Sequence, residues 1–590
     1  MADQQYDVLV IGASTGGVAA ALRASAMGAS VCLIDPTDWV GGQFTSQGVS
    51  KPDENKYIEN VGSTASYREF KHLVRAWYRN NAHLSSVGAS QPTLNPGGPY
   101  DAAQPQFAVE PKLGDTILKQ MIQGAPSLHW RPNTEVMQFE LPGDEIAAVN
   151  TRASDGSETR YVAKYVLDAT DLGDCLPRVL RDGEWVVGAE GQDGSGEAGR
   201  PQNANPKWNQ PIIVVCAIEY RPDNPNGTIA KPPNYERHRD EQKYSIVDGP
   251  SLKTMFHGEM TMFNYRQYLD SRNFNDASYR YDRTTLNAHA NDYGIKSIPT
   301  GDPAEDARII QEARDASIGF LYWLQTECPR DPQDGPGNGY PELWPATTAF
   351  GTSDGMAPVA YIRESRRIKA LKTILRGEVE KSGANPGPRA QLYDDSCGIG
   401  TYAMMDVHEL PGQGMAGAWI PIWPAQIPMR ALIPQRVTNL LAACKNLGTT
   451  HFTNGLYRLH PFEWNIGESA GALAAFCVTQ NTTPHAVAAS AHLIRGYQRA
   501  LLGQGIPLYW WTDVMPGDPL WEAVQMVGAT QVIEGDDDQM RFNPNDPVTD
   551  GVRTAIQQKT GTAVPAGIDS RGHLAAWIFA QGLHLTTATG

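Results

Sequence analysis

Cysteine is scarce in this sequence and widely scattered. Seven cysteines occur among 590 residues, with no Cys-x-x-Cys pair and no second ligand nearby, so we expect neither a disulfide framework nor a metal site. No apolar run reaches the roughly 18 residues that a membrane-spanning helix needs, and the first residues lack the basic and apolar regions of a signal peptide. These absences predict a cytoplasmic protein that does not bind a membrane.

Positive charge is also in short supply. Lys and Arg number 49 against 65 Asp and Glu, which gives a net charge of −16, and no basic block is present that would neutralise a row of phosphates. Nucleic acid is therefore not an expected partner. Glycine and proline are abundant by contrast, with 57 and 42 residues, and 41% of the chain is apolar. This composition and length indicate a loop-rich globular protein of more than one domain.

The N-terminal segment has the strand, helix and strand order of a dinucleotide-binding fold. An apolar run at 6–11 predicts a buried parallel strand, and the Ala-rich run at 18–27 predicts a helix. A second apolar strand is predicted at 30–34, and it ends at Asp35. In this fold an acidic residue at that place binds the ribose hydroxyls of the nucleotide, so we expect the same of Asp35.

A glycine-rich turn joins the first strand to the helix. Gly12 permits a tight bend, and Gly17 allows the helix to pack closely on the strand. Ser14 replaces the usual middle glycine, but it is small enough to let a phosphate approach, and Thr15 follows it. We expect the helix N-terminus to face a pyrophosphate. For a glycine triplet alone, the alternative is an ordinary strand-to-helix turn.

Four separated parts of the chain carry a family resemblance. They are the opening motif with a second glycine turn at 41–43, the strand and turn at 165–174, the stretches 355–368 and 395–400, and the region 439–471. Together they resemble the bacterial FAD-dependent oxidoreductases whose Rossmann lobe is of the glutathione-reductase type. One departure is Asp171, which stands where the family pattern has glycine.

The resemblance implies that the cofactor is FAD and that the fold is α/β. A discontinuous Rossmann-like FAD-binding domain would occupy 1–185 and 425–480, an α+β substrate domain 186–424, and a C-terminal helical cap 481–590. The helix near Gly467 would point its N-terminus at the flavin C2 carbonyl. A strand at 129–139 would pass the adenine, although a surface strand is an equal alternative. The implied cofactor residues are Gly12, Ser14, Thr15, Gly17, Asp35, Gly41, Gly42, Gln43, Val136, Ala169, Thr170, Asp171, Asn446, Gly467 and Ala470.

Flavin oxidation of an alcohol or amine needs a base near the carbon that loses hydride, and histidine suits this role at neutral pH. His460 is the first candidate because Arg458-Leu459-His460-Pro461 precedes the helix predicted to face the flavin. Arg458 would stabilise anionic flavin or bind a carboxylate. The alternative is a structural His460 with Arg458 paired to Glu463. His451 is the second candidate base, and Cys397 is a candidate redox or covalent-flavin residue, against the alternative of a buried thiol.

Two further sets of polar residues are expected to have structural rather than catalytic roles. His408 is expected to be a structural histidine, and the charged residues of 363–367 are predicted to lie on a helix, with Arg363 and Arg367 on one face.

The sequence therefore predicts an FAD-dependent oxidoreductase that oxidises a polar small molecule by hydride transfer to flavin N5. The substrate would be an alcohol, sugar, amine or hydroxy acid. A second hypothesis comes from residues 508–560, which resemble a single S-layer-homology repeat without its wall-binding element. It describes a cell-wall-associated binding protein that retains a structural flavin. An internal helical cap is the favoured interpretation of this tail.

Overall fold

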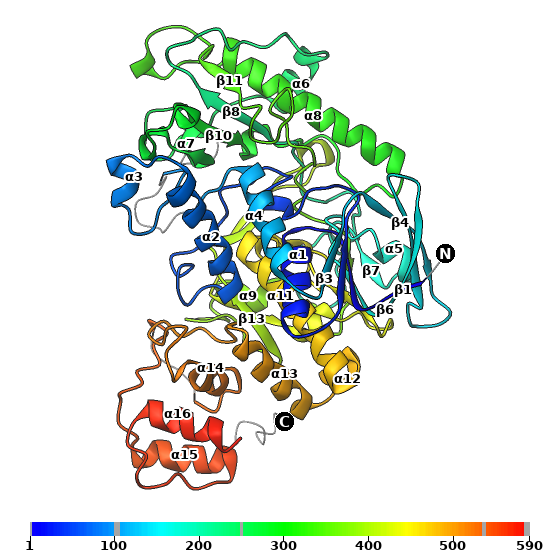
Figure 1. Cartoon of the computed structure of the whole chain (residues 1–590), viewed down its shortest axis with the longest axis vertical. Helices are drawn as coiled ribbons and strands as arrows, with labels where there is room; N and C mark the ends of the chain where they lie inside the picture. The colour runs from blue at the N-terminus through cyan, green and yellow to red at the C-terminus, as the bar shows by residue number, and fades with distance from the viewer. Residues whose placement is uncertain (1–2, 99–106, 248–251, 534–537, 583–590) are drawn as a thin grey trace.

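The computed structural model describes residues 3–98, 107–247, 252–533 and 538–582 (Figure 1). Its centre is a seven-stranded sheet with the strand order β3-β2-β1-β6-β5-β4, and β17 pairs with β6 beside this path. The strands are β1 Asp3–Ile11, β2 Val31–Ile34, β3 Leu128–Arg131, β4 Thr134–Glu140, β5 Ala148–Ala153, β6 Glu158–Asp168 and β17 Leu440–Ala442. The predicted α/β class with a Rossmann-like parallel core is confirmed.

Parallel pairing brings the carboxyl ends of four strands to one edge of the sheet. Ile11 of β1 pairs with Ile34 of β2 and with Asp168 of β6. Asp168 pairs in turn with Ala442 of β17, so a strand from late in the chain completes this edge. Ligands of open α/β sheets bind outside the carboxyl ends of the strands, which makes this edge the place to look for a site.

Two helices lie in close contact beside the sheet. Helix α1 (Thr15–Ala26) follows β1, and α11 (His460–Gln480) lies against it along the centre of the molecule (Figure 1). A Cβ atom on Gly467 would lie 2.0 Å from the carbonyl oxygen of Gly16, and one on Gly471 would lie 2.2 Å from that of Ala20. Only glycine allows the two backbones to approach this closely.

The position of α11 corrects one prediction. The helix begins at His460, so Gly467 and Ala470 lie inside it rather than at its N-terminus. Both residues are buried against other parts of the core. Gly467 therefore allows α11 to pack closely on α1. The N-terminus of α11, which was expected near Gly467, lies at His460.

A second lobe is built on an antiparallel sheet. Its strands are β8 Cys216–Tyr220, β9 Gln267–Leu269, β10 Asp282–Leu286 and β11 Leu343–Pro345, in the order β11-β8-β10-β9. Helix α8 (Pro303–Thr326) runs along the top of Figure 1. Its aromatic end, with Phe320 and Trp323, is buried in the apolar cluster of this lobe. That end belongs to the core rather than to a pocket.

Shorter elements connect the lobes. The remaining strands form pairs: β7 Trp185–Val186 with β12 Arg367–Ile368, β13 Ser396–Gly400 with β16 Ala425–Pro428, and β14 Met404–Val407 with β15 Ala418–Pro421. The other helices are α2 Ala65–Asn81, α3 Ser86–Ser90, α4 Pro111–Gly124, α5 Leu176–Val179, α6 Tyr235–Gln242, α7 Met262–Tyr265, α9 Arg376–Val379 and α10 His451–Tyr457. Among the described residues, no helix has the length and apolarity needed to cross a bilayer.

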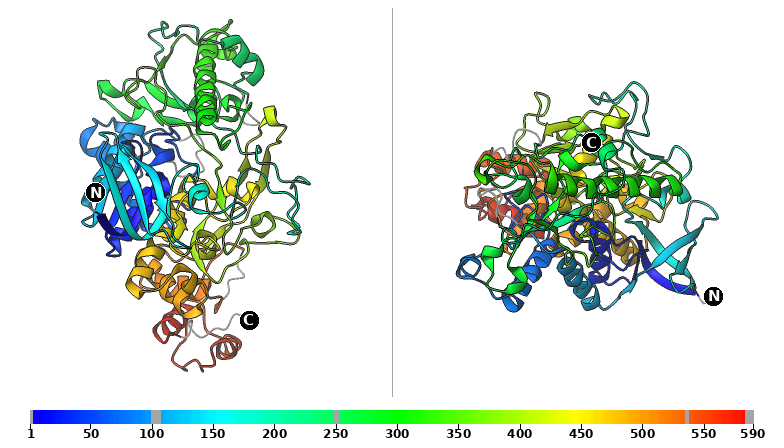
Figure 2. Two further views of the ribbon diagram at one scale, coloured as in Figure 1. Left: turned by 90° about the vertical axis from the view of Figure 1, so that its right-hand side faces the viewer. Right: turned by 90° about the horizontal axis from the view of Figure 1, so that it is seen from above.

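The C-terminal part of the described chain is helical. It contains α12 Pro484–Ala488, α13 Ala491–Gly503, α14 Trp521–Ala529, α15 Asp550–Thr560 and α16 Arg571–Ala580. These helices lie at the end of the molecule opposite the second lobe (Figures 1 and 2). Helix α13 packs on α11, and Arg389 donates hydrogen bonds to the carbonyl of Trp510. The three domain boundaries given by the sequence stay a prediction.

Candidate active site

A cavity of about 870 Å³ opens at the edge where β1, β2 and β6 end. Its walls come from the loops after these strands, from β4, from the N-terminal turns of α8 and from the segment 359–366. The structure brings together in its lining the following residues predicted to bind the cofactor: Gly12, Ser14, Asp35, Gly42, Val136, Ala169, Thr170 and Asp171. Segments from five distant parts of the chain thus meet around one space.

The N-terminus of α1 forms one wall of the cavity. The N–H of Gly17 donates to the Ser14 hydroxyl at 3.2 Å, and the N–H of Gly16 donates to Glu463 Oε1 at 3.2 Å. The N–H groups of Ser14 and Thr15 reach no acceptor within the described ranges. They carry the partial positive charge of the helix end, which suits an anion such as a pyrophosphate.

The second glycine turn keeps this helix end open. A Cβ on Gly42 would lie 3.0 Å from both the Cα of Ser14 and the N of Thr15, so any larger residue would fill the space. Gly41 has φ +100°, and its carbonyl accepts a hydrogen bond from the Thr15 hydroxyl at 2.8 Å. The Thr15 hydroxyl and Gly41 therefore hold the turn against the helix.

Asp35 is fixed on the cavity wall by hydrogen bonds. Its Oδ2 accepts from the N–H of Ala13 at 2.7 Å, and its Oδ1 accepts from the N–H and the hydroxyl of Thr37, both at 2.8 Å. Burial raises the pKa of the carboxyl, and these hydrogen bonds oppose the rise. An ionised carboxylate offers about four acceptor positions, so capacity remains for ribose hydroxyls.

Three buried amide side chains near the cavity each have an unpaired oxygen. Gln43 Nε2 donates to the carbonyl of Arg458 at 2.8 Å, Gln47 Nε2 to Asp171 Oδ2 at 2.7 Å, and Asn446 Nδ2 to the carbonyl of Asp168 at 3.0 Å. These bonds fix the amide orientations and leave Gln43 Oε1, Gln47 Oε1 and Asn446 Oδ1 without a partner in the described parts of the chain.

Unpaired buried acceptors destabilise a fold unless a bound molecule satisfies them. The ribityl chain of FAD carries hydroxyl donors, and the flavin ring carries an imide N–H. The buried Nε of Arg458 is likewise unpaired within the described residues. Its N–H can donate a hydrogen bond to a flavin carbonyl or ring nitrogen. The chemistry of these groups therefore fits FAD.

Asp171 keeps the turn after β6 despite replacing a glycine. Gly173, two residues on, has φ +62° and makes the bend. The Asp171 carboxylate accepts from Gln47 and pairs with the buried ammonium of Lys445. Lys445 also faces Glu463 Oε2 at 3.5 Å. The departure from the family pattern thus adds a charge pair beside the cavity and leaves the chain path intact.

The candidate base His460 has no ring nitrogen available for a substrate. Its Nε2 donates to the carbonyl of Val49 at 2.9 Å, and its Nδ1 faces the N–H of Asp53 at 3.5 Å. The ring is fully buried, and burial lowers its pKa to about 3. This geometry argues against His460 as the base and supports the structural alternative.

The alternative partner given for Arg458 is wrong. Arg458 pairs with Asp406 Oδ2 at 3.1 Å and donates to the hydroxyl of Tyr361 at 3.0 Å, not to Glu463. Its own carbonyl accepts from Gln43, so Arg458 lies next to the glycine turn that borders the cavity.

The other two predicted catalytic residues are also held by the protein. His451, the first residue of α10, binds Glu364 Oε2 through Nδ1 at 2.8 Å. Cys397 lies in β13, where its thiol donates to the carbonyl of Ile427 at 3.2 Å and burial raises its pKa. Neither residue lines the cavity. The buried-thiol interpretation fits Cys397, and a redox or covalent-flavin role does not.

The charged segment 363–367 is extended, so its prediction as a helix is wrong. Arg366 lines the cavity, while Arg363, Glu364 and Arg367 are buried with partners from different parts of the chain. These partners are Asp292, His451 and Glu190. On a helix, Arg363 and Arg367 would point from the same face. In the extended chain their side chains instead reach partners in different parts of the protein.

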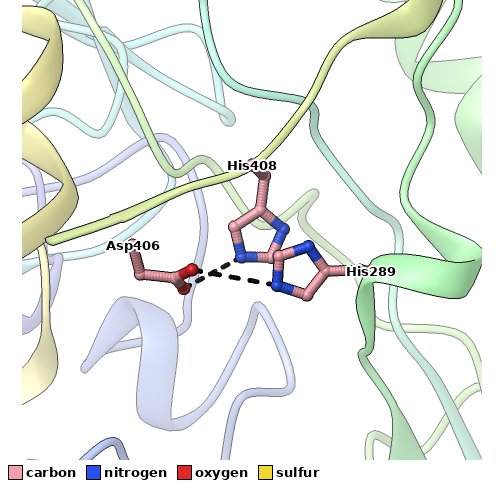
Figure 3. Close-up of side chains that lie close together, drawn as sticks. All are labelled: His289, Asp406 and His408. Carbon is pink, nitrogen blue, oxygen red and sulfur yellow. Dashed lines mark hydrogen bonds and ion pairs between the residues drawn. The ribbon is translucent and has the colours of Figure 1, made fainter. Parts of the chain in front are cut away.

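One polar cluster was missed by the sequence analysis (Figure 3). His408 binds Asp406 Oδ2 through Nε2 at 3.0 Å and Asp292 Oδ2 through Nδ1 at 2.5 Å. The ring of His289 stacks on that of His408, with centroids 3.5 Å apart and planes 7° apart. We name His289, Asp292, Asp406 and His408 the His289 cluster. Only the Asp-x-His pattern at 406–408 signals it locally.

Asp168, at the end of β6, gives the site a pH-dependent stability. Its Oδ1 accepts from the N–H and the hydroxyl of Thr170 at 3.0 and 2.7 Å, and burial raises its pKa to about 6. An unfolded aspartate has a pKa of about 3.9, so the folded state binds this proton more tightly. The contribution of Asp168 to the free energy of unfolding is therefore full at low pH. It is lost as the pH rises from about 4 to about 6.

Asp168→Asn is expected to remove this pH dependence. In the flavin-free protein, the change in unfolding free energy between about pH 4.5 and 7.5 should shrink by about 2 kcal/mol, because asparagine does not titrate but can still accept from Thr170. Urea unfolding at the two pH values measures it. Asp38→Asn, at an exposed position, is the control. An equal pH dependence in Asp168→Asn and the wild type would contradict the assignment.

Comparison with known proteins supports the same interpretation. Residues 7–501 match the model of the family described as FAD dependent oxidoreductase. Dihydrolipoyl dehydrogenase 3 of Pseudomonas putida is 26% identical over 190 residues, which are 32% of this chain and 35% of that protein, so the match spans about a third of the relative's length. The S-layer-homology resemblance of the tail lies outside these matches and stays a prediction.

Solved flavoenzyme structures are also similar to parts of the chain. The p-nitrophenol 4-monooxygenase of Pseudomonas putida covers 64% of this chain and 73% of its own, with 13% identity and a TM-score of 0.29. The thioredoxin reductase of T. acidophilum covers 33% and 39%, with 16% identity and a TM-score of 0.16. The fold assignment therefore rests on the strand order described above. With most of its length matched by the family model, the chain belongs to the family of FAD-dependent oxidoreductases, and its cofactor is FAD.

Proposed function

We propose that this protein catalyses the two-electron oxidation of a polar small molecule and that FAD binds in the 870 Å³ cavity. The observation that carries the proposal is the meeting of five distant segments around this cavity, with unpaired N–H groups at one wall and unpaired amide oxygens close by. Bound FAD supplies an acceptor for one hydride, which carries both electrons of the oxidation. The cytoplasmic location and the division into domains given above are part of this proposal.

Each part of the cofactor has matching groups in this chain. The N–H groups of Ser14 and Thr15 would hold the pyrophosphate, and Asp35 would accept from the ribose hydroxyls. Val136 in β4 borders the same space, beside the expected adenine position. Gln43 and Asn446 would accept from hydroxyl and imide donors of the ribityl and flavin parts. Arg458 provides a fixed positive charge next to Gln43, which would stabilise negative charge.

Absorption spectroscopy tests the cofactor assignment directly. The purified protein, with FAD added if needed, is expected to show a flavin band near about 450 nm and to release FAD on denaturation. A colourless protein after incubation with FAD would contradict the proposal. The oxidation itself is tested by anaerobic bleaching of this band with sugars, polyols, amines and hydroxy acids, at least one of which should reduce the flavin.

A further inference from the structure

One buried lysine links two carboxylates beside the cofactor cavity. Lys445, shortly after β17, is fully buried, and its ammonium pairs with Asp171 and faces Glu463 Oε2 at 3.5 Å. Asp171 lines the cavity, and Glu463 lies in the first turn of α11. We name these three residues the Lys445 triad. Its members come from three separate segments that meet at this point.

Each carboxylate of the triad holds one glutamine amide. Asp171 Oδ2 accepts from Gln47 Nε2 at 2.7 Å, and Glu463 Oε2 accepts from Gln43 Nε2. The carbonyl of Arg458 accepts from the same nitrogen of Gln43 at 2.8 Å, so the orientation of this amide is fixed twice. Both glutamines are fully buried, and the oxygen of each amide has no partner in the part of the chain that the structure describes.

The surroundings of Glu463 require an ionised carboxylate. Its Oε1 accepts from the N–H of Gly16 at 3.2 Å and faces the thiol of Cys444 at 3.6 Å, while its Oε2 faces Gln43 and Lys445. All four neighbours are donors, so a proton on Glu463 would find no acceptor among them. Burial raises the pKa of Glu463, and the charge of Lys445 opposes this rise. Lys445 thus favours the ionised state that Gln43 needs.

The charge of Lys445 is used within the protein. Burial alone would lower the pKa of Lys445, but the carboxylates of Asp171 and Glu463 outweigh it and raise this pKa. One positive charge therefore faces two negative charges, and none is left over for a pyrophosphate. Lys445 is also not among the described residues that line the cavity. Its ammonium acts on the two carboxylates rather than as a phosphate ligand.

We propose that Lys445 is a positioning residue for the ribityl chain of FAD. Its ammonium fixes the two carboxylates, the carboxylates fix the two amides, and the unpaired amide oxygens accept hydrogen bonds from ribityl hydroxyls. This inference rests on the proposed function and specifies how the same site selects its cofactor. ADP has the adenosine and the pyrophosphate of FAD but no ribityl chain, so the triad should favour FAD over ADP.

The affinities of the flavin-free chain for FAD and for ADP test this inference. Lys445→Met should weaken the binding of FAD about tenfold more than the binding of ADP. Both ligands carry the pyrophosphate, so any direct effect of the lost charge on the phosphates cancels in this ratio. Calorimetry measures both affinities. Equal losses for FAD and ADP would overturn the inference.

Lys71→Met is the matched control. Lys71 is also fully buried, and its ammonium pairs with Glu54 and Glu59, both at 2.8 Å. None of these three residues is among those described as lining the cavity. The control loses the same kind of charge network and should keep the wild-type ratio of the two affinities. The same change of ratio in Lys71→Met and Lys445→Met would overturn the inference.

Gln47→Leu removes one acceptor and leaves the triad in place. It should weaken the binding of FAD about fivefold relative to ADP, because one hydrogen bond to the ribityl chain is lost. This variant replaces Lys445→Met if circular dichroism shows that Lys445→Met is misfolded. An unchanged ratio of the two affinities in a folded Gln47→Leu protein would overturn the inference.

FAD analogues that lack one ribityl hydroxyl separate the ribityl chain from the flavin ring. At least one analogue should bind the wild type about fivefold more weakly than FAD does. The same analogue and FAD should bind Lys445→Met with equal affinity, because the acceptor is no longer held in place. Wild-type protein that binds every analogue as tightly as FAD would overturn the inference.

The same titrations distinguish this inference from the proposed function. A wild-type protein that binds neither FAD nor ADP contradicts the proposed function. A wild-type protein that binds FAD, together with equal losses for both ligands in Lys445→Met, contradicts this inference alone.

Discussion

Replacement of Gly467 by alanine is expected to destabilise the fold by about 3 kcal/mol or more. The added Cβ would lie 2.0 Å from the carbonyl oxygen of Gly16, so α1 and α11 would have to separate. Backbone atoms cannot rotate away as a side chain does, and these helices share the longest contact between any two elements of the described chain. In an exposed helix the same change would stabilise by up to about 1 kcal/mol, so the expected effect has the opposite sign.

The midpoint and slope of urea unfolding measure this loss. Gly503→Ala is the control, because Gly503 ends α13 and a Cβ there would meet nothing within 4 Å. We expect the control to unfold like the wild type or at slightly higher urea. A Gly467→Ala protein as stable as the control would show that the two helices are not held at the distance seen here.

The parts of the fold that the sequence predicted correctly are those with local signals. Apolar runs and glycine spacing within a short stretch predict a strand, a glycine turn, a helix and a second strand that ends at Asp35. The structure contains each of these elements. The start of helix α8 also has a local signal, since Asp302 directly precedes Pro303. The aspartate accepts from the N–H of Ala304 as an N-cap, so the local reason is visible in the structure.

The start of α11 was misplaced although a local signal was present. Pro461 is the second residue of the helix, and proline is favoured in the first turn because its missing N–H needs no partner there. The small residues around Gly467 were given more weight, because the family resemblance suggested a helix end near them. In the structure these residues serve helix packing.

The His289 cluster could not be predicted from local patterns. Asp292 and His408 are separated by 116 residues, and His289 precedes both on a short 3-10 turn without periodic signal. Likewise, the spacing of Arg363 and Arg367 suits a helix, but burial with partners from distant segments favours an extended path. Tertiary pairing of charges decides these positions, and one sequence does not show which distant residues will meet.

Valine at position 42 is expected to leave the protein without flavin. Gly42 has φ +49°, and its Cβ position lies 3.0 Å from the Cα of Ser14 and the N of Thr15. The γ-methyl groups of valine would extend over the N–H groups proposed to bind the pyrophosphate, and they would replace anion contacts with apolar surface. We expect the affinity for FAD to fall about a thousandfold, which corresponds to roughly 4 kcal/mol.

Backbone strain must be separated from this loss of space, because a β-branched residue is unfavourable at positive φ wherever it stands. Gly156→Val supplies the control: Gly156 has φ +84° in the turn between β5 and β6, and a Cβ there meets nothing within 4 Å. FAD titration followed at about 450 nm, with circular dichroism of both variants, measures the difference. We expect Gly156→Val to stay yellow and Gly42→Val to be colourless but folded. A folded Gly42→Val protein that binds FAD like Gly156→Val would show that the helix N-terminus at Ser14 and Thr15 does not bind the pyrophosphate.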